Sequence, residues 1–110
     1  LPTWLSPIQV QAITISEKHK RYANEVKSLL ETAGVRVKLD DSDNTIGKKI
    51  RIHRKMRPAY MVIIGDDDEK NRTVSIRARD GQQKNDIPLN DFIADIFAEI
   101  TNRSKTLDIV

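Results

Sequence analysis

Six cationic side chains gather in one short window of this 110-residue chain, and no acidic residue interrupts them. This basic window runs from Lys48 to Arg57, and its charge of +6 exceeds the +3 net charge of the whole chain. The remaining residues therefore sum to −3, so the basic character is local. A local positive patch on an otherwise acidic body predicts a surface that binds phosphate groups.

The basic window also has the periodicity of an amphipathic helix. Its apolar arc holds Ile46, Ile50, Ile52, His53 and Met56, and its charged arc holds Lys48, Arg51, Arg54 and Lys55. Lys49 falls within the apolar arc, from which its long stem could extend outward to solvent. A solvated helix face without any ligand is the competing interpretation of this pattern.

Other residue types that carry chemistry are sparse or poorly placed. The four glycines are too dispersed for a phosphate-binding loop. The acidic pairs Asp40/Asp41 and Asp66/Asp67 stand in predicted turns, where acidic residues are favoured for local reasons. With no cysteine and only His19 and His53, the chain offers no zinc site, and we predict neither catalytic nor metal-binding residues.

The bulk composition is that of a single folded domain spanning residues 1–110, with 38% hydrophobic and 32% charged residues. No apolar run approaches the roughly 20 residues of a membrane span, so we expect no membrane association. The absence of cysteine fits a reducing compartment. Because the chain starts at Leu1 without an initiator methionine, we expect it to be an excised piece of a longer protein.

The first half of the chain predicts an extended N-terminal segment and two strands around a helix. The segment covers residues 1–8, whose prolines disfavour a helix. A strand at 10–15 precedes a helix with Ser16 as its N-cap and Gly34 as its left-handed C-terminal residue. Alternation over 35–39 predicts the second strand, and the basic helix follows until Pro58.

The second half predicts three strands and a final helix. Residues 60–64 are apolar without interruption, as in a central strand, and an acidic turn at 65–71 follows. Residues 73–79 alternate, with Arg77 and Arg79 on the polar face, and an edge strand at 84–89 comes next. The last helix has Asn90 as its cap and should bury Phe92, Ile93, Ile96, Phe97 and Ile100, and residues 103–110 should form a flexible tail.

The predicted fold is of the α/β class, with a mixed, mostly parallel five-stranded sheet flanked by three helices. Strands that alternate with helices favour parallel pairing through right-handed crossovers, and the final strands add an antiparallel edge. Ligands of such sheets collect at the carboxyl ends of the strands. In this chain those ends carry Ser16 and residues 40–45 and 65–69.

Four stretches together resemble the C-terminal anticodon-binding domain of threonyl-tRNA synthetases, a class II aminoacyl-tRNA synthetase family. They are Leu1–Val10 (LPTWLSPIQV), Gly34–Val37 (GVRV), Ile46–Arg51 (IGKKIR) and Pro58–Asp66 (PAYMVIIGD). The resemblance covers nearly the whole chain. Prolyl, histidyl and glycyl enzymes share the fold and the basic helix but begin differently, so the Pro-Thr-Trp-Leu start discriminates best.

This resemblance implies a parent enzyme that attaches threonine to its tRNA with ATP, magnesium and zinc bound in an upstream catalytic domain. The chain itself would hold no cofactor and would bind the anticodon loop of threonine tRNA. The family's enzymes are usually dimers, and we expect a cytoplasmic location, with a mitochondrial form as the alternative.

The resemblance also implies the site residues. Arg77 matches the arginine that reads the central guanine of the anticodon, and Asp68 stands where the family has a glutamate beside it. Lys48, Lys49 and Arg51 would contact the loop or its backbone. Asp43 stands where an asparagine is common, within a stretch, 40–45, that departs from the family pattern.

Two alternatives stay open at this stage. Arg77 could instead pair with the acidic residues at 66–69 across the turn. The same fold could also serve a non-catalytic accessory subunit whose basic helix contacts a protein or duplex DNA, or another class II synthetase with a different anticodon.

Overall fold

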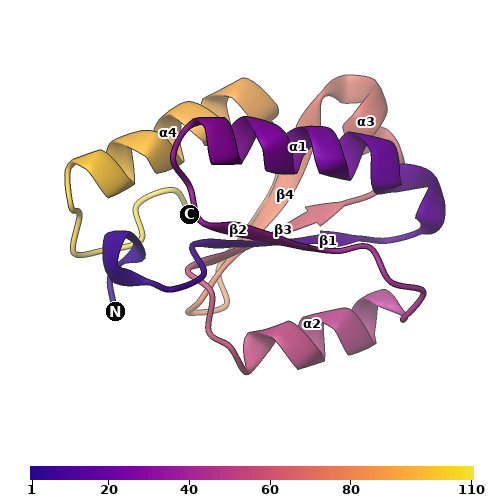
Figure 1. The fold of residues 1–110 in the computed structure, drawn as a ribbon, viewed down its shortest axis with the longest axis horizontal. Coiled ribbons are helices and arrows are strands. Elements are labelled where there is room, and N and C mark those ends of the chain that lie inside the picture. Colours follow the sequence, from indigo (N-terminus) through magenta and orange to yellow (C-terminus); the bar gives the residue numbers. More distant parts are fainter.

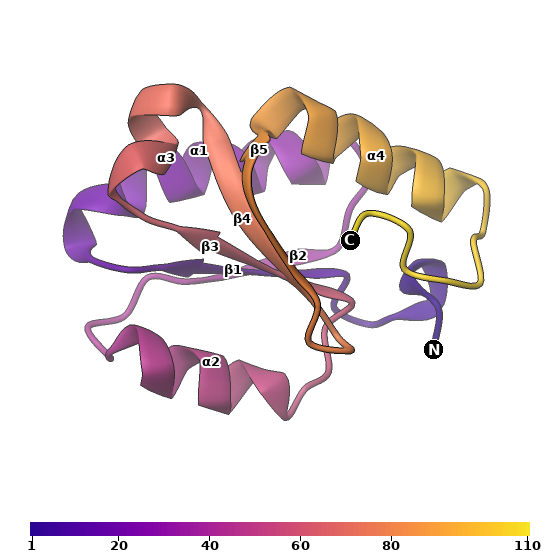
Figure 2. The same cartoon turned by 180° about the vertical axis from the view of Figure 1, so that it is seen from behind.

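A five-stranded mixed sheet forms the centre of the molecule in the computed structural model, which describes all residues from Leu1 to Val110 (Figures 1 and 2). The strand order is β2-β1-β3-β4-β5. The strands are β1 (Val10–Thr14), β2 (Val37–Asp40), β3 (Tyr60–Ile64), β4 (Thr73–Ala78) and β5 (Gln83–Pro88). Strand β1 pairs in parallel with β2 and β3, whereas β3 with β4 and β4 with β5 are antiparallel. The predicted mixed sheet, with 60–64 as its central strand, is confirmed.

Helices cover both faces of this sheet. Helices α1 (Lys20–Thr32) and α4 (Leu89–Thr101) lie side by side on one face, and α2 (Ile46–Arg54) lies on the other (Figure 1). Short 3₁₀ turns at Thr3–Leu5 and Glu17–His19 precede β1 and α1. The basic window therefore does form a helix, as predicted, and Gly34 takes the expected left-handed conformation with φ 86°.

The acidic stretch after β3 is a helix rather than the predicted turn, which gives the fold four α-helices instead of three. Helix α3 (Asp66–Asn71) has acidic residues throughout its first turn, where they interact favourably with the helix dipole. The Asp68 carboxylate also accepts a hydrogen bond from the Gly65 amide at 2.8 Å, which is the N3-to-N-cap half of a capping box; Gly65 has no side chain to supply the other half. The turn prediction failed because aspartate is favoured both in turns and in the first turn of a helix, so its presence at 66–68 does not distinguish the two.

Two predicted helix starts differ from the structure. Ser16 makes no side-chain capping bond, because a 3₁₀ turn separates it from α1. Helix α4 begins at Leu89, directly after Pro88, so Asn90 lies within its first turn instead of capping it. Phe97 is also not inward: it is 51% exposed, while Phe92 and Ile96 are fully buried.

The main core lies between the sheet and the pair α1/α4. Val74, Ile76 and Ala78 of β4 face this core, as their alternation predicts. Tyr60 of β3 meets Phe92 of α4 edge to face, with ring centroids 6.4 Å apart. The β4 residues that alternate with Val74, Ile76 and Ala78, including Arg77, consequently face the side on which α2 lies.

The two ends of the chain meet beside this core. The N-terminal segment, residues 1–8, is not fully extended, because it contains the 3₁₀ turn at Thr3–Leu5. Arg36 Nη2 donates to the Ser6 carbonyl at 2.8 Å and so fastens this segment to the body of the domain. Residues 103–110, expected to be a flexible tail, fold back so that Ile109 is buried and Arg103 lies over the Trp4 ring. None of the helices is long and apolar enough to cross a membrane.

Candidate nucleic-acid interface

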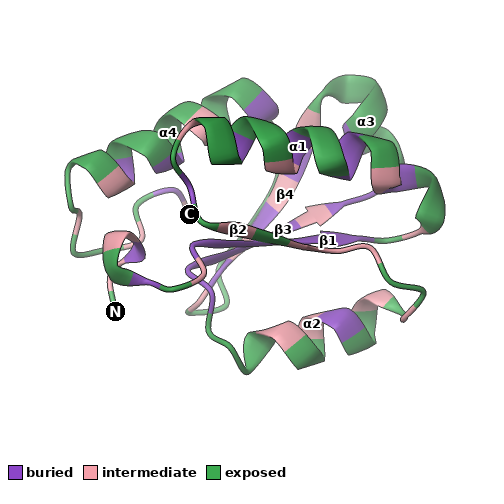
Figure 3. Ribbon diagram, viewed as in Figure 1, coloured by how far each residue is buried: buried purple, intermediate pink, exposed green.

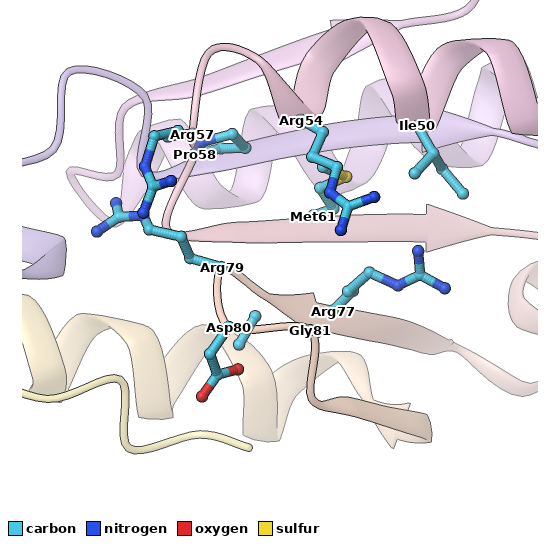
Figure 4. A pocket seen from close by; sticks show the side chains of 10 residues that line it. Ile50, Arg54, Arg57, Pro58, Met61, Arg77, Arg79, Asp80 and Gly81 are labelled. Atoms are coloured by element: carbon cyan, nitrogen blue, oxygen red, sulfur yellow. The ribbon is translucent and has the colours of Figure 1, made fainter.

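A cavity of about 340 Å³ lies between the end of α2 and the α2-facing side of strands β3 and β4 (Figure 4). Four arginines line it, two from each side: Arg54 and Arg57 belong to the basic window, Arg77 lies in β4, and Arg79 directly follows that strand. Asp80 is the only acidic residue in its lining. We call this feature the arginine cavity.

The sheet register explains why these arginines converge. Arg77 lies opposite Met61 in the β3–β4 pairing, and Arg79, just beyond the end of β4, lines the same cavity. Pro58 ends the basic window and leads the chain into β3, so Arg54 and Arg57 are held above the same strand. Ile50 and Met61 add an apolar surface to this positive cavity.

Arg77 has hydrogen-bonding capacity to spare. Its Nη2 donates to the Gln83 side-chain oxygen at 3.0 Å, while its Nε is buried without any partner. Arg77 forms no ion pair with the acidic residues of α3, so the alternative in which it pairs across the turn is not what the structure has. In Figure 4 its guanidinium and that of Arg54 point toward the same opening, near Met61.

The basic residues of α2 do not all share one environment. Lys48 and Arg51 are exposed, so both remain available to an external ligand. Lys49 is 1% exposed and donates from Nζ to the Thr14 carbonyl at 2.8 Å and to Thr14 Oγ1 at 3.2 Å. It is the buried residue of α2 (Figure 3), so the expectation that its stem extends outward to solvent is wrong.

The two acidic candidates lie away from Arg77. Asp68 follows the carboxyl end of β3, whereas Arg77 lies beside Met61 near the start of that strand. Asp68 is also buried, and its second carboxylate oxygen accepts from Thr73 Oγ1 at 2.8 Å, so both oxygens are used internally. Asp43 is exposed in the loop before α2. The arginine cavity lies at the start of β3, so it is at the opposite end of the parallel strands from the carboxyl ends where the sequence predicted a ligand site.

Both histidines lie beside a carboxylate, and His19 Nε2 is 3.1 Å from that of Asp66. His53 Nε2 lies 2.6 Å from the Asp40 carboxylate, which links α2 to the end of β2. Burial alone would raise the pKa of Asp40, but hydrogen bonds from Ser42 and His53 outweigh it and lower this pKa to about 2. No group of three or more histidine, cysteine, aspartate or glutamate residues could hold a metal ion.

Sequence reasoning missed three members of the cavity: Arg54, Arg57 and Arg79. Signals for all three were present, because two stand in the basic window and Arg79 shares the polar face of its strand with Arg77. Neither the basic window nor the alternation of β4 predicts that the end of α2 lies against the end of β4. That contact depends on the register of β3 with β4.

These features place the chain in the class of mixed α/β domains that carry a positive, partly apolar cavity, a surface suited to a phosphate-bearing ligand. The comparison with family models narrows this class. Residues 9–99 match the model described as "Anticodon binding domain", so the chain belongs to the anticodon-binding domain family.

Named relatives agree with this membership. The chain is 41% identical over 104 residues to a threonine–tRNA ligase of Nocardioides, and this stretch covers 94% of the chain and 16% of that relative. The RNA-binding domain of threonyl-tRNA synthetase from Cryptosporidium parvum superposes with a TM-score of 0.84 and 36% identity, over 91% of the chain and 25% of that protein. Prolyl-tRNA synthetase of the same organism superposes with 0.79 at 33% identity, over 94% and 23%.

Proposed function

We propose that this chain is the anticodon-binding module of a threonine–tRNA ligase and that its arginine cavity takes the anticodon loop of threonine tRNA. The observation that carries the proposal is the Arg77 side chain, which stands in a positive cavity with a buried donor that no internal group uses. Family membership and the threonine–tRNA ligase relatives supply the kind of RNA.

The chemistry of the cavity suits an unstacked base. Sequence-specific RNA recognition uses loop bases that are splayed out of the stack. The planar fork of an arginine matches the O6 and N7 acceptors of guanine, the central base of threonine anticodons. Met61 and Ile50 offer an apolar surface to the guanine, and the guanidinium of Arg54 offers a planar group on which the guanine ring can stack.

The remaining candidates receive different roles in this proposal. Lys48 and Arg51 are exposed and would bind backbone phosphates. Asp43 is exposed as well and would lie close to the loop only if the RNA extends along α2. Lys49 and Asp68 would act indirectly, because their polar groups fix α2 and α3.

The parent protein is part of the proposal, since the matched stretch spans only 16% of the Nocardioides ligase. The parent would join threonine to its tRNA with ATP, in a separate catalytic domain that holds the magnesium and zinc ions. It would act as a homodimer in the cytoplasm or, alternatively, in mitochondria.

A titration of the chain at one near-physiological salt concentration tests the proposal. Threonine tRNA, the same tRNA with its central anticodon guanine replaced, and an unrelated tRNA are compared. We expect a selective loss of affinity when the guanine is replaced, and we expect Arg77→Ala to weaken cognate binding by about 1–3 kcal/mol while it erases this selectivity.

The other outcomes separate the competing functions. Equal binding of all three RNAs would leave only a general phosphate patch, and preference for another anticodon would indicate a different class II synthetase. Stronger binding of duplex DNA than of tRNA would support an accessory interaction module. Salt dependence alone cannot distinguish these cases, because every phosphate-binding surface loses affinity as salt rises.

A further inference from the structure

Two of the four arginines stand apart at one end of the arginine cavity. Arg57 and Arg79 also line a second cavity, of about 370 Å³, which borders the C-terminal residues Leu107 and Val110. In Figure 4 their guanidinium groups are turned to the same side, away from those of Arg54 and Arg77. The pair therefore lies between two hollows and presents its charge to both.

Arg57 has a backbone conformation that its side chain disfavours. Its φ of 49° lies in the left-handed region, directly before Pro58. Backbone strain at a residue with a side chain is often found at functional sites. Arg57 is exposed and takes part in no ion pair or side-chain hydrogen bond, so nothing inside the chain explains why an arginine stands here.

Arg79 is held in place beside it. Its Nη2 donates to Ser6 Oγ at 2.8 Å, its Nη1 donates to the Leu1 carbonyl, and its Nε is buried without a partner. Burial and then the neighbouring charge of Arg57 lower the pKa of Arg79, so the two cations repel each other. An external anion would relieve this repulsion.

No carboxylate of the chain neutralises the pair. Asp80 is the acidic residue that lines both cavities, but it forms no ion pair with either arginine. Its carboxylate instead accepts from the Gln82 backbone at 3.0 Å and from the Gln82 side chain at 3.2 Å. The positive charge of Arg57 and Arg79 remains available to a ligand.

We propose that Arg57 and Arg79 form a phosphate subsite that holds the backbone of the RNA next to the base that Arg77 reads. Arg77 lies in β4 and Arg79 directly after its end, so their Cα atoms are about 7 Å apart, while their guanidinium groups diverge (Figure 4). A base held by Arg77 can therefore have a neighbouring phosphate at Arg57 and Arg79. The inference rests on the proposed function, and it assigns base reading and backbone binding to different arginines of one cavity.

The Arg57→Gly variant provides a clean test. Glycine adopts a positive φ without strain, so this variant should unfold at the same or a higher denaturant concentration than the wild type. Arg21→Gln removes an exposed cation from α1, on the other face of the sheet, and serves as the matched charge control. Binding is measured by fluorescence anisotropy with the anticodon stem-loop of threonine tRNA, intact or with its central guanine replaced, over a range of salt concentrations.

We expect Arg57→Gly to weaken both stem-loops by the same factor, about tenfold, and to lower the slope of log affinity against log salt by about 1. Arg21→Gln should change neither quantity. If Arg57→Gly binds like the wild type, or if only the intact stem-loop is weakened, the phosphate subsite is refuted. If the wild type fails to prefer the intact stem-loop, the proposed function fails, and the slope of Arg57→Gly still decides on the subsite.

Neutral phosphates give an independent readout. Methylphosphonate is placed at one position of the stem-loop after another, which removes a single backbone charge each time. At one position next to the central guanine, the substitution should weaken the wild type but not Arg57→Gly, the coupling expected of directly interacting groups. Equal losses in both proteins at every position would overturn the assignment.

Discussion

Lys49 differs from the other cations of the basic window because its charge is buried. Its neighbour Lys48 is exposed on the same helix, so one step along the sequence separates a residue open to ligands from one that supports the fold. The Lys49 ammonium keeps two hydrogen bonds to Thr14, which lowers the cost of its burial. The apolar arc on which the sequence places Lys49 therefore indicates its buried position, whereas Lys48 lies on the charged arc and stays exposed.

Substitution of these two lysines should separate stability from binding. Lys49→Ala removes a buried stem and its hydrogen bonds, so we expect the free energy of unfolding to fall by about 2–3 kcal/mol. Lys48→Ala should leave stability unchanged and reduce tRNA affinity. Urea unfolding and tRNA titration of both variants provide the measurement. If both variants lose the same tRNA affinity and unfold at the same urea concentration, the separation of a structural Lys49 from a ligand-binding Lys48 is contradicted.

The Asp40–His53 pair should give the protein a defined acid sensitivity. The pKa of Asp40 is lowered to about 2 in the folded protein, so the unfolded chain binds a proton more tightly. The resulting stabilisation, ~2 kcal/mol, is complete above about pH 4 and is lost as the pH falls toward the folded value. We expect the stability difference between wild type and Asp40→Asn to shrink over this range in urea unfolding curves. A constant difference between pH 5 and pH 2 would show that Asp40 is not the source.

At the scale of elements, α3 shows how a short helix depends on one side chain. Asp68 joins the Gly65 amide at the start of α3 to Thr73 at the start of β4, so it fixes both ends of the β3–β4 connection. This local role accounts for its burial more directly than contact with a base does. Helix α2, by contrast, is positioned by Lys49 and His53 and leaves its charged arc free.

Asp68→Ala tests this assignment. The loss of the Asp68 hydrogen bonds with the Gly65 amide and Thr73 Oγ1 should lower the free energy of unfolding by about 1–2 kcal/mol. The folded variant should keep its preference for the central guanine in the tRNA titration. A selective loss of that preference at unchanged stability would instead restore Asp68 as a base reader.

At the scale of the whole molecule, a buried carboxylate joins the two ends of the chain. Glu99 of α4 accepts hydrogen bonds from Thr3 Oγ1, from the Tyr60 hydroxyl at 2.7 Å and from the Asp108 amide at 2.7 Å. Burial, and then the hydrogen bond to Glu99, raise the pKa of Tyr60 well above its usual range. Thr3 and Asp108, near the two ends of the chain, are thus held to Tyr60 of the central strand through one side chain.

Removal of residues 107–110 distinguishes a packed end from a flexible one. The truncation exposes the surface that Ile109 covers and leaves Glu99 without one donor, so we expect a loss of about 2 kcal/mol in the free energy of unfolding. Amide hydrogen exchange of the intact chain should also show protection at Asp108 and Ile109. Rapid exchange at both amides, with no loss of stability on truncation, would indicate the flexible tail that the sequence predicts.

The sequence by itself determined the elements whose patterns are local. Alternation predicted the faces of β4, an unbroken apolar run predicted the central strand, and helical periodicity predicted α2, because each depends on neighbours within a few residues. It also placed Arg77 and Arg79 together on one polar face. The four motifs that resemble threonyl-tRNA synthetases then predicted the family that the comparisons confirm.

Only the tertiary structure decided which of these charged residues can meet. Lys49 proved to be internal because its hydrogen-bond partner, Thr14, comes from the end of another strand. Arg54 and Arg57 reach the same cavity as Arg77 because β3 returns the chain beneath α2 in a fixed register. Such contacts depend on strand pairing between distant residues, which no local pattern of charge or hydrophobicity records.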